Sequence, residues 1–141
     1  MTITAEMFNA RQKGTLPDRL GIEVEEATPE RMVLSLNVTP GHHAANGFLH
    51  AGSVVTLADT ACGYGTVLNL PEGASGFTTI ELKSNFFATA LAGRVVATAT
   101  PVHVGRTTQV WDAEVVSGES GKRMALFRCT QSVLWPRAQL G

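Results

Sequence analysis

The amino-acid sequence predicts an α+β fold in which one long central helix is wrapped by a curved antiparallel sheet of five to six strands. Residues 51–69 are apolar or small on nearly every side of a helical wheel, so other structure must enclose this helix. Alternating strand patterns precede and follow this segment, with turn residues between them. A single sheet that curls around the helix is the economical way to bury it.

The predicted helix 51–69 has its larger apolar residues at helical spacing. They are Val54, Val55, Leu57, Ala58, Ala61, Val67 and Leu68. Gly63 and Gly65 lie in the same segment, and each lowers helix stability by about 1 kcal/mol relative to alanine. We expect these glycines to let another part of the backbone approach the helix closely.

Two strand patterns come before the helix and four come after it. The predicted strands are 22–26, 31–38, 77–87, 94–104, 107–117 and 122–135. Short, turn-rich connections between the last four predict an antiparallel meander. Pro101 cannot donate a ladder hydrogen bond, so we expect it at an edge or a bulge. Residues 4–13 predict a short N-terminal helix that ends at Gly14.

Length and composition indicate a single domain over residues 1–141, with its core at about 20–135. The net charge of −1 favours neither a nucleic acid nor an anionic membrane as a partner. The chain has no apolar stretch of about 20 residues, which a transmembrane helix requires, and its first residues lack a signal-peptide pattern. We therefore expect a cytoplasmic protein in which Cys62 and Cys129 are buried, reduced thiols.

Asp59 is the only charged residue in the predicted helix 51–69. Because a carboxylate is costly to bury, this residue either pairs with a neighbouring group or serves a function. A glycine-rich loop, residues 46–52, leads directly into the helix. It should place free backbone N–H groups and the positive end of the helix dipole at residues 50–53, where an oxyanion or a polarised carbonyl oxygen can bind.

These two features lie too far apart on one helix to act together on a small group of atoms. Asp59 follows Ala51 by eight residues, or about 12 Å along the helix axis. Two such helices packed side by side would bring the N–H of one copy to the carboxylate of the other. The open edges of the sheet also favour pairing with a second copy. We therefore expect at least a homodimer, with a dimer of dimers as the larger assembly.

The residues from His50 to Ala61, HAGSVVTLADTA, resemble the signature of the PaaI-type hotdog-fold acyl-CoA thioesterases, relatives of 4-hydroxybenzoyl-CoA thioesterase. In that family, His-Gly-Gly precedes an Asp or Glu by about six residues. Further similarity, at 78–82, 85–86, 105–108 and 125–128, extends the match over roughly residues 20–135. The resemblance implies the hotdog fold and the hydrolysis of an acyl- or aryl-CoA thioester to the free acid and CoA.

The resemblance also implies roles for individual residues. Asp59 matches the catalytic carboxylate, either the base that activates water or the nucleophile that attacks the thioester. Ala51 matches the residue whose backbone N–H polarises the thioester carbonyl, and it stands where the family usually has glycine. His50 and Gly47 match positions that shape the loop, and Thr79 matches a hydroxyl residue that assists the carboxylate or the water.

A second group of residues would bind the substrate. Several relatives carry Asn or Gln where this chain has Ala44, so we expect Asn46 to contact the carbonyl instead. The backbone of Gly47 and Gly52 belongs to the same binding loop, and Phe48 could line an acyl or aryl pocket. Arg106, in a glycine-containing turn, is a candidate for binding a CoA phosphate. The alternatives for this role are Lys83, Arg94, Arg123 and Arg128.

The implied chemistry needs no metal and no cofactor, because CoA is part of the substrate. A polarised carbonyl, a base or nucleophile and a good leaving thiolate are sufficient. The loop histidines lack a spaced set of carboxylate or thiol ligands, so we expect no metal site. Two alternatives are a non-catalytic hotdog protein that binds acyl-CoA and a hydratase of the same fold, which would require an Asp/His pair in a different motif. The sequence leaves the acyl group open.

Overall fold

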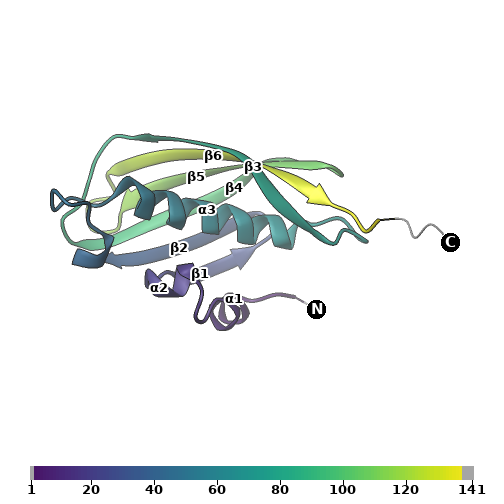
Figure 1. The fold of residues 1–141 in the computed structure, drawn as a ribbon, viewed down its shortest axis with the longest axis horizontal. Helices are drawn as coiled ribbons and strands as arrows, with labels where there is room; N and C mark the ends of the chain where they lie inside the picture. The colour runs from purple at the N-terminus through teal and green to yellow at the C-terminus, as the bar shows by residue number, and fades with distance from the viewer. Residues whose placement is uncertain (1, 138–141) are drawn as a thin grey trace.

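The computed structural model describes residues 2–137, which form a six-stranded antiparallel sheet around one long helix (Figure 1). The strands are β1 (Glu23–Thr28), β2 (Arg31–Val38), β3 (Gly76–Phe86), β4 (Gly93–Val104), β5 (Thr108–Ser117) and β6 (Arg123–Leu134), and the helix is α3 (Ala51–Leu68). All seven elements confirm the predicted segments, with ends shifted by at most two residues. The predicted α+β class and the wrapping of a central helix are therefore confirmed.

The order of the strands is β1-β2-β4-β5-β6-β3, so the predicted meander of the last four strands is wrong. After Phe86 the chain crosses the end of the sheet and enters β4 at Gly93. The N–H groups of Phe87 and Ala88 donate to the Met124 carbonyl and hold this crossing against the start of β6. β3 consequently pairs with β6 at one edge of the sheet, and β4 pairs with β2 and β5 in its middle.

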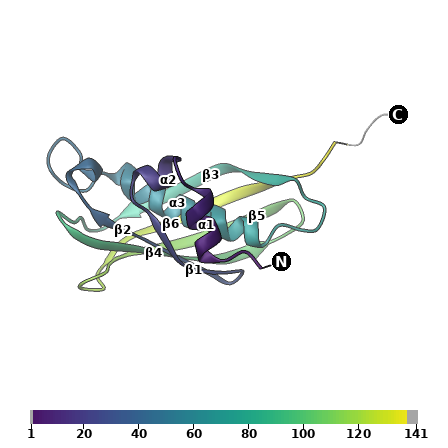
Figure 2. The same ribbon diagram turned by 90° about the horizontal axis from the view of Figure 1, so that it is seen from below.

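Helix α3 lies along the concave face of the sheet and contacts all six strands (Figures 1 and 2). Its face toward the sheet is fully buried at Leu57, Ala58, Ala61 and Cys62. The apolar side chains of the inward-facing strand positions meet this helical face and form the core. Gly65 allows a close approach, as predicted, but the group that approaches is the ring of a tryptophan rather than another backbone.

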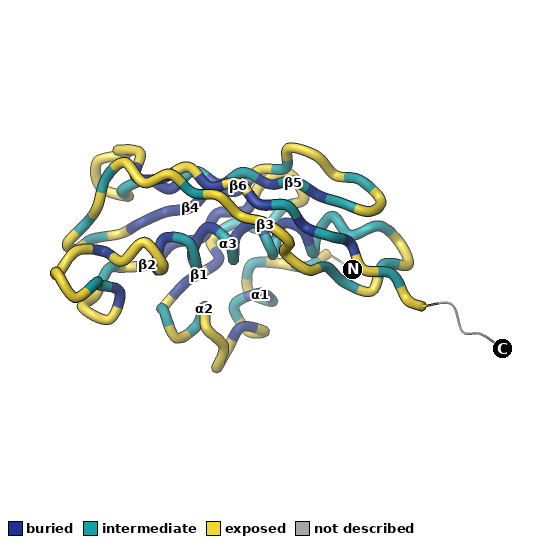
Figure 3. The backbone as a smooth tube through the Cα atoms, turned by 45° about the horizontal axis from the view of Figure 1, so that its top comes forward, coloured by how far each residue is buried: buried dark blue, intermediate teal, exposed yellow. Residues whose placement is uncertain are grey.

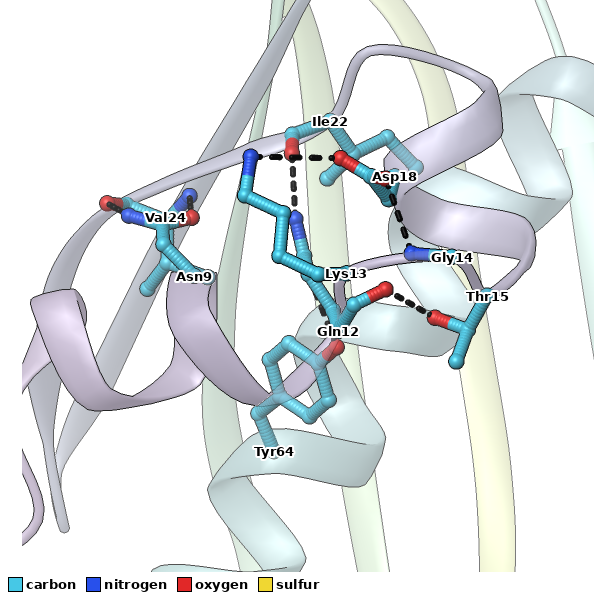
Figure 4. A network of polar contacts seen from close by, with 9 residues as sticks. All are labelled: Asn9, Gln12, Lys13, Gly14, Thr15, Asp18, Ile22, Val24 and Tyr64. Atoms are coloured by element: carbon cyan, nitrogen blue, oxygen red, sulfur yellow. Dashed lines mark hydrogen bonds and ion pairs between the residues drawn. The ribbon is translucent and has the colours of Figure 1, made fainter.

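Two short helices at the N-terminus cover one flank of α3 (Figure 2). The first, α1 (Ala5–Arg11), confirms the predicted N-terminal helix, whereas α2 (Leu16–Arg19) was not predicted. Pro17 lies in the first turn of α2, directly after Leu16, where a proline is well tolerated because the N–H that it lacks has no partner within the helix. Gln12, between the two helices, accepts a hydrogen bond of 2.8 Å from the Tyr64 hydroxyl of α3 (Figure 4). This contact fixes the N-terminal segment to the central helix.

Two further predictions are confirmed. The pairing of β4 with β5 shifts register between Pro101 and His103, so the proline lies at a bulge. Cys62 and Cys129 are free and buried. Burial, together with the neighbouring Cys129 thiol, raises the pKa of Cys62 well above its ordinary value, which keeps this thiol protonated and unreactive.

The edge strand β3 is exposed along most of its length (Figure 3). Its apolar side chains include Ile80, Leu82 and Phe86, which are 61%, 44% and 45% exposed. A long edge strand with exposed apolar residues presents unpaired N–H and C=O groups and favours pairing with another strand. In a single chain, no other strand among residues 2–137 therefore covers the free edge of β3.

Candidate active site

The N-terminus of α3 presents a free backbone N–H group. His50 is the N-cap, and its Nδ1 accepts a hydrogen bond of 2.7 Å from the Gly52 N–H. Because Nδ1 is an acceptor, the neutral ring carries its proton on Nε2. The N–H groups of Ser53 and Val54 are directed to the His50 carbonyl. The Ala51 N–H forms no hydrogen bond with any residue from 2 to 137, and Ala51 is exposed.

The loop that leads to α3 is a tight turn. Gly47 has φ of +87°, a conformation that favours glycine, and its N–H donates to the Ala44 carbonyl. Asn46 Oδ1 accepts a hydrogen bond of 3.2 Å from the Phe48 N–H. The side-chain oxygen of Asn46 therefore stabilises the turn, and its amide nitrogen takes no part in this contact. Phe48 is 45% exposed at the tip. The loop residues predicted to bind substrate are therefore grouped beside the free Ala51 N–H.

Asp59 lies in the middle of α3, one turn before Gly63, and a Cβ built on Gly63 would lie 3.3 Å from the Phe77 ring of the edge strand β3. Its Oδ1 atom is buried and has no hydrogen-bond partner among the residues described. Burial raises the pKa of the Asp59 carboxyl above its ordinary value, because desolvation disfavours the charged form. Buried polar atoms are nearly always paired, so an unpaired carboxylate oxygen in a helix indicates a functional group.

Thr79 lies on β3, on the face of the strand that is turned toward α3. Its hydroxyl donates a hydrogen bond of 2.6 Å to Oε1 of Gln131, which is directly opposite on β6. Gln131 is fully buried, and its Nε2 has no partner among the residues described. Sequence reasoning missed Gln131, although its alternation with the apolar residues of β6 was a usable signal, since a polar residue on an inward face needs a partner.

The structure brings some of the predicted residues together and keeps others apart. His50, Ala51 and Gly52 lie at one end of α3 beside the loop, whereas Asp59 lies about 12 Å along the same helix axis. Three cavities among the described residues 2–137 are lined by other residues. One of them, of about 700 Å³, is on the outer face of the sheet and is lined by residues such as Lys83, Asp112 and Arg128.

A comparison with known proteins identifies the family. The model of the thioesterase superfamily matches residues 46–123, which include the whole of α3. The chain belongs to this superfamily. A 1,4-dihydroxy-2-naphthoyl-CoA hydrolase of Listeria monocytogenes is 34% identical over 118 residues, or 84% of this chain and 94% of that protein.

Solved structures agree with this assignment. The crystal structure of a mutant thioesterase from Pseudomonas aeruginosa has a TM-score of 0.89 at 33% identity, covering 95% of this chain and 96% of that one. The PaaI protein of E. coli has a TM-score of 0.79 at 26% identity, with 90% and 89% covered. The resemblance to PaaI-type hotdog thioesterases is therefore confirmed, and the chain is a thioester hydrolase.

In this thioesterase, Arg106 lies in the turn between β4 and β5 and is exposed. Its guanidinium carbon lies 4.2 Å from the centre of the Trp135 ring, and the Trp135 Nε1–H donates to the Arg106 carbonyl at 3.1 Å. This stacking limits the motion of the arginine and leaves its N–H groups free to bind an anion. Trp135, which sequence reasoning missed, therefore supports a predicted site residue.

Within residues 2–137, no group of three or more His, Cys, Asp and Glu side chains is arranged to hold a metal ion. None of the helices described is both long enough and apolar enough to cross a membrane.

Proposed function

We propose that this thioesterase hydrolyses acyl- or aryl-CoA thioesters at a site shared between two copies of the chain. Asp59 of one copy activates the attack on the thioester, and the Ala51 N–H of the other copy polarises the carbonyl. The observation that carries the proposal is the pair of unpartnered groups on α3, a buried carboxylate oxygen and a free N–H. They are complementary in chemistry but about 12 Å apart in one chain.

The exposed edge of β3 supports the pairing of two copies. If β3 of one copy pairs with β3 of another, the sheet becomes continuous and the two open flanks of α3 face each other. The exposed Ile80 and Leu82 side chains would then be buried. The proposal therefore makes a homodimer the smallest active unit, and a dimer of dimers a larger assembly that keeps the same site.

The proposed chemistry uses only groups of this chain and of its substrate. The Ala51 N–H, at the positive end of the helix dipole, stabilises the negative charge that develops on the carbonyl oxygen. Asp59 accepts the proton of the attacking water, or attacks directly. The C–S bond then breaks, and the CoA thiolate leaves with little need of a proton.

The remaining loop residues would bind the rest of the substrate. The amide nitrogen of Asn46 is available to the substrate carbonyl, and Phe48 offers an apolar surface to the acyl or aryl group. Gly47 and Gly52 keep the loop close to the thioester. Arg106, stacked on Trp135, would bind a CoA phosphate. The name of the Listeria relative is consistent with an aromatic acid as the acyl part.

The test is a hydrolysis assay over short, medium, long and aromatic CoA esters, with the wild-type chain and the Asp59→Asn variant. We expect hydrolysis of at least one class by the wild type and none above background by Asp59→Asn. Circular dichroism and the measured mass of the assembly should be unchanged. Hydrolysis of wild-type rate by the variant would refute the role of Asp59. Binding of CoA esters by the wild type without turnover would instead support the non-catalytic alternative.

A further inference from the structure

The edge strand β3 carries two charged side chains without an ionic partner. They are Glu81 and Lys83, the only charged residues of β3, and both are exposed. Neither forms an ion pair with any residue from 2 to 137. They lie two residues apart, so their side chains project from the same face of the sheet. A second copy of the same edge can neutralise both charges, because it offers the opposite charge for each.

Lys83 has no counter-charge on the neighbouring strand. The residue directly opposite Lys83 on β6 is Arg128, which carries the same charge. Like charges in directly opposite positions of a sheet repel and destabilise the pair. Asp112 accepts hydrogen bonds of 2.6 and 2.8 Å from the guanidinium of Arg128, so this carboxylate is already paired. An anion for Lys83 is therefore expected from beyond the free edge of β3.

The free edge of β3 presents backbone groups at alternate residues. At the end of the strand, the Phe87 N–H donates to the Met124 carbonyl of β6 at 2.8 Å. In an antiparallel ladder, the residues that bond to one neighbouring strand alternate with those that do not. Residues 81–86 pair with β6 without a shift in register, so the backbone groups of 81, 83 and 85 also face β6. Those of Leu82 and Ser84 consequently face the free edge.

A second copy of β3 can add to this edge in several registers, which differ in the charges that they oppose. In an antiparallel pair with twofold symmetry, one residue lies opposite its own copy, and its two neighbours lie opposite each other. A twofold axis at residue 81 would oppose two copies of Glu81, and an axis at residue 83 would oppose two copies of Lys83. An axis at residue 82 instead places each Glu81 opposite a Lys83. Electrostatics therefore favours the axis at residue 82.

We propose that two copies of the chain pair through β3 in this one register, with Leu82 opposite Leu82 of the partner subunit. Each Glu81 then forms an ion pair with the partner's Lys83, so the symmetric contact contains two such pairs. Both pairs flank the hydrogen-bonded leucines and occupy non-hydrogen-bonded positions, where Cα atoms are about 4.5 Å apart and side chains are closest. This inference rests on the proposed function, and it names the contact that brings the two copies of α3 together.

The same register buries apolar surface at the symmetry axis. Leu82 lies opposite Cys129, which is 1% exposed on the inner face of β6. The Leu82 side chain therefore points to the side of the sheet on which α3 lies, yet it is 44% exposed in a single chain. At the axis, two Leu82 side chains meet on that inner face and cover each other. Apolar contact on the inner face and charge pairing on the outer face thus favour the same arrangement.

Disulfide cross-linking tests the register directly. Non-hydrogen-bonded pairs place Cβ atoms close enough for a disulfide, and the native Cys62 and Cys129 are buried. Glu81→Cys and Lys83→Cys are each oxidised with diamide, alone and after the two are mixed and re-associated. We expect a cross-linked dimer in the mixture only, with one copy of each variant by mass spectrometry. Cross-linked dimers of Glu81→Cys alone or of Lys83→Cys alone, or no cross-link in the mixture, would overturn the proposed register.

Charge reversal tests the two ion pairs. We expect Glu81→Lys or Lys83→Glu alone to raise the dissociation constant of the dimer by about ten- to a hundredfold at low ionic strength, because two attractive pairs become repulsive. An equal mixture of the two variants should restore a dimer as tight as the wild type, because both pairs are attractive again in the mixed dimer. Sedimentation velocity measures the dissociation constants.

Lys122→Glu is the control for a reversed surface charge, since Lys122 is exposed in the turn between β5 and β6. It should leave the dissociation constant within about twofold of the wild type. Equal weakening by this control, or no recovery in the mixture, would overturn the inference. Both experiments measure mass and use no substrate, so failure of the proposed function appears separately, as no thioester hydrolysis by the wild-type dimer.

Discussion

The ring of Trp111 packs directly on the backbone of Gly65, so a Cβ built on this glycine would lie 2.5 Å from the ring. Trp111 is fully buried and is held by the hydrogen bond from its Nε1 to Gln109, so it cannot move away easily. This contact gives a physical reason for a glycine in the middle of the central helix. It also sets the distance between α3 and the centre of the sheet.

We expect Gly65→Ala to destabilise the fold by about 1–3 kcal/mol, because overpacking against the ring outweighs the gain of about 1 kcal/mol in helix propensity. Urea unfolding measures the change. Gly63→Ala is the control, since its added Cβ would lie 3.3 Å from the Phe77 ring, which is partly exposed and can shift. Equal loss in both variants would contradict the specific role of the Trp111 contact.

We expect Ala51→Pro to lower kcat by about a hundredfold or more while the helix is retained, because proline removes the N–H that stabilises the oxyanion. Proline is favourable at the first position of a helix. The preceding residue, His50, has φ of −68° and ψ of 135°, which is compatible with a following proline. Ala51→Ser keeps the N–H and should retain activity. Steady-state kinetics and circular dichroism decide between loss of a catalytic group and loss of fold.

A mixture of two inactive variants tests whether the site is shared. In a mixed dimer of Asp59→Asn and Ala51→Pro subunits, one site carries both defects and the other carries none. Random re-association after mild denaturation should therefore restore roughly a quarter of the wild-type activity, because half of the dimers are mixed and each has one intact site. No recovery, with mixed dimers shown by mass spectrometry, would mean that both groups act within one chain.

The raised pKa of Asp59 has a consequence for stability. The Asp59 carboxyl binds its proton more tightly in the folded chain than in the unfolded chain, where the pKa of Asp is about 3.9. As the pH rises from about 3.9 through the pKa of the folded state, Asp59 therefore lowers the free energy of unfolding. We expect Asp59→Asn to be more stable than the wild type, by a margin that is larger at about pH 7 than at about pH 4.5. Thermal unfolding in both buffers measures it. A margin that does not grow with pH would contradict a desolvated carboxylate.

Arg106 offers a test of where the nucleotide part of CoA binds. We expect Arg106→Gln to raise KM for a CoA ester by roughly three- to tenfold without a change in kcat, through loss of a charge-assisted hydrogen bond to phosphate. The matching pantetheine ester lacks the nucleotide phosphates, so its KM should not change. Arg123→Gln is the control for lost surface charge, because Arg123 is paired with Glu114 at 2.9 Å. Equal effects of the two variants would exclude a specific role for Arg106.

The elements of the fold were predictable because each depends on local patterns. The apolar spacing of residues 51–69 and the alternation in the strands predicted all seven main elements, whereas α2 was missed because its four residues are too few to show a helical period. The order of the strands was not predictable in the same way. Alternation specifies which face of a strand is buried, but not which strand lies beside it, so β3 was expected next to β4 and is found next to β6.

The residues of the candidate site differ in the same way, because some were predictable from the local sequence and others were not. Asp59 and Ala51 stand out in the sequence by themselves, one as the only charge on an apolar helix and the other at the end of a glycine-rich loop. Gln131 does not stand out in the sequence, because its hydrogen-bond partner, Thr79, is 52 residues away in the chain. Which polar atoms find partners is decided when α3 docks on the β3–β6 pair. The sequence by itself thus determined the secondary structure, the family and the carboxylate, since these depend on residue type and local spacing. Only the tertiary structure decided the free edge at β3 and the unpaired Gln131 nitrogen, since both depend on contacts between distant segments.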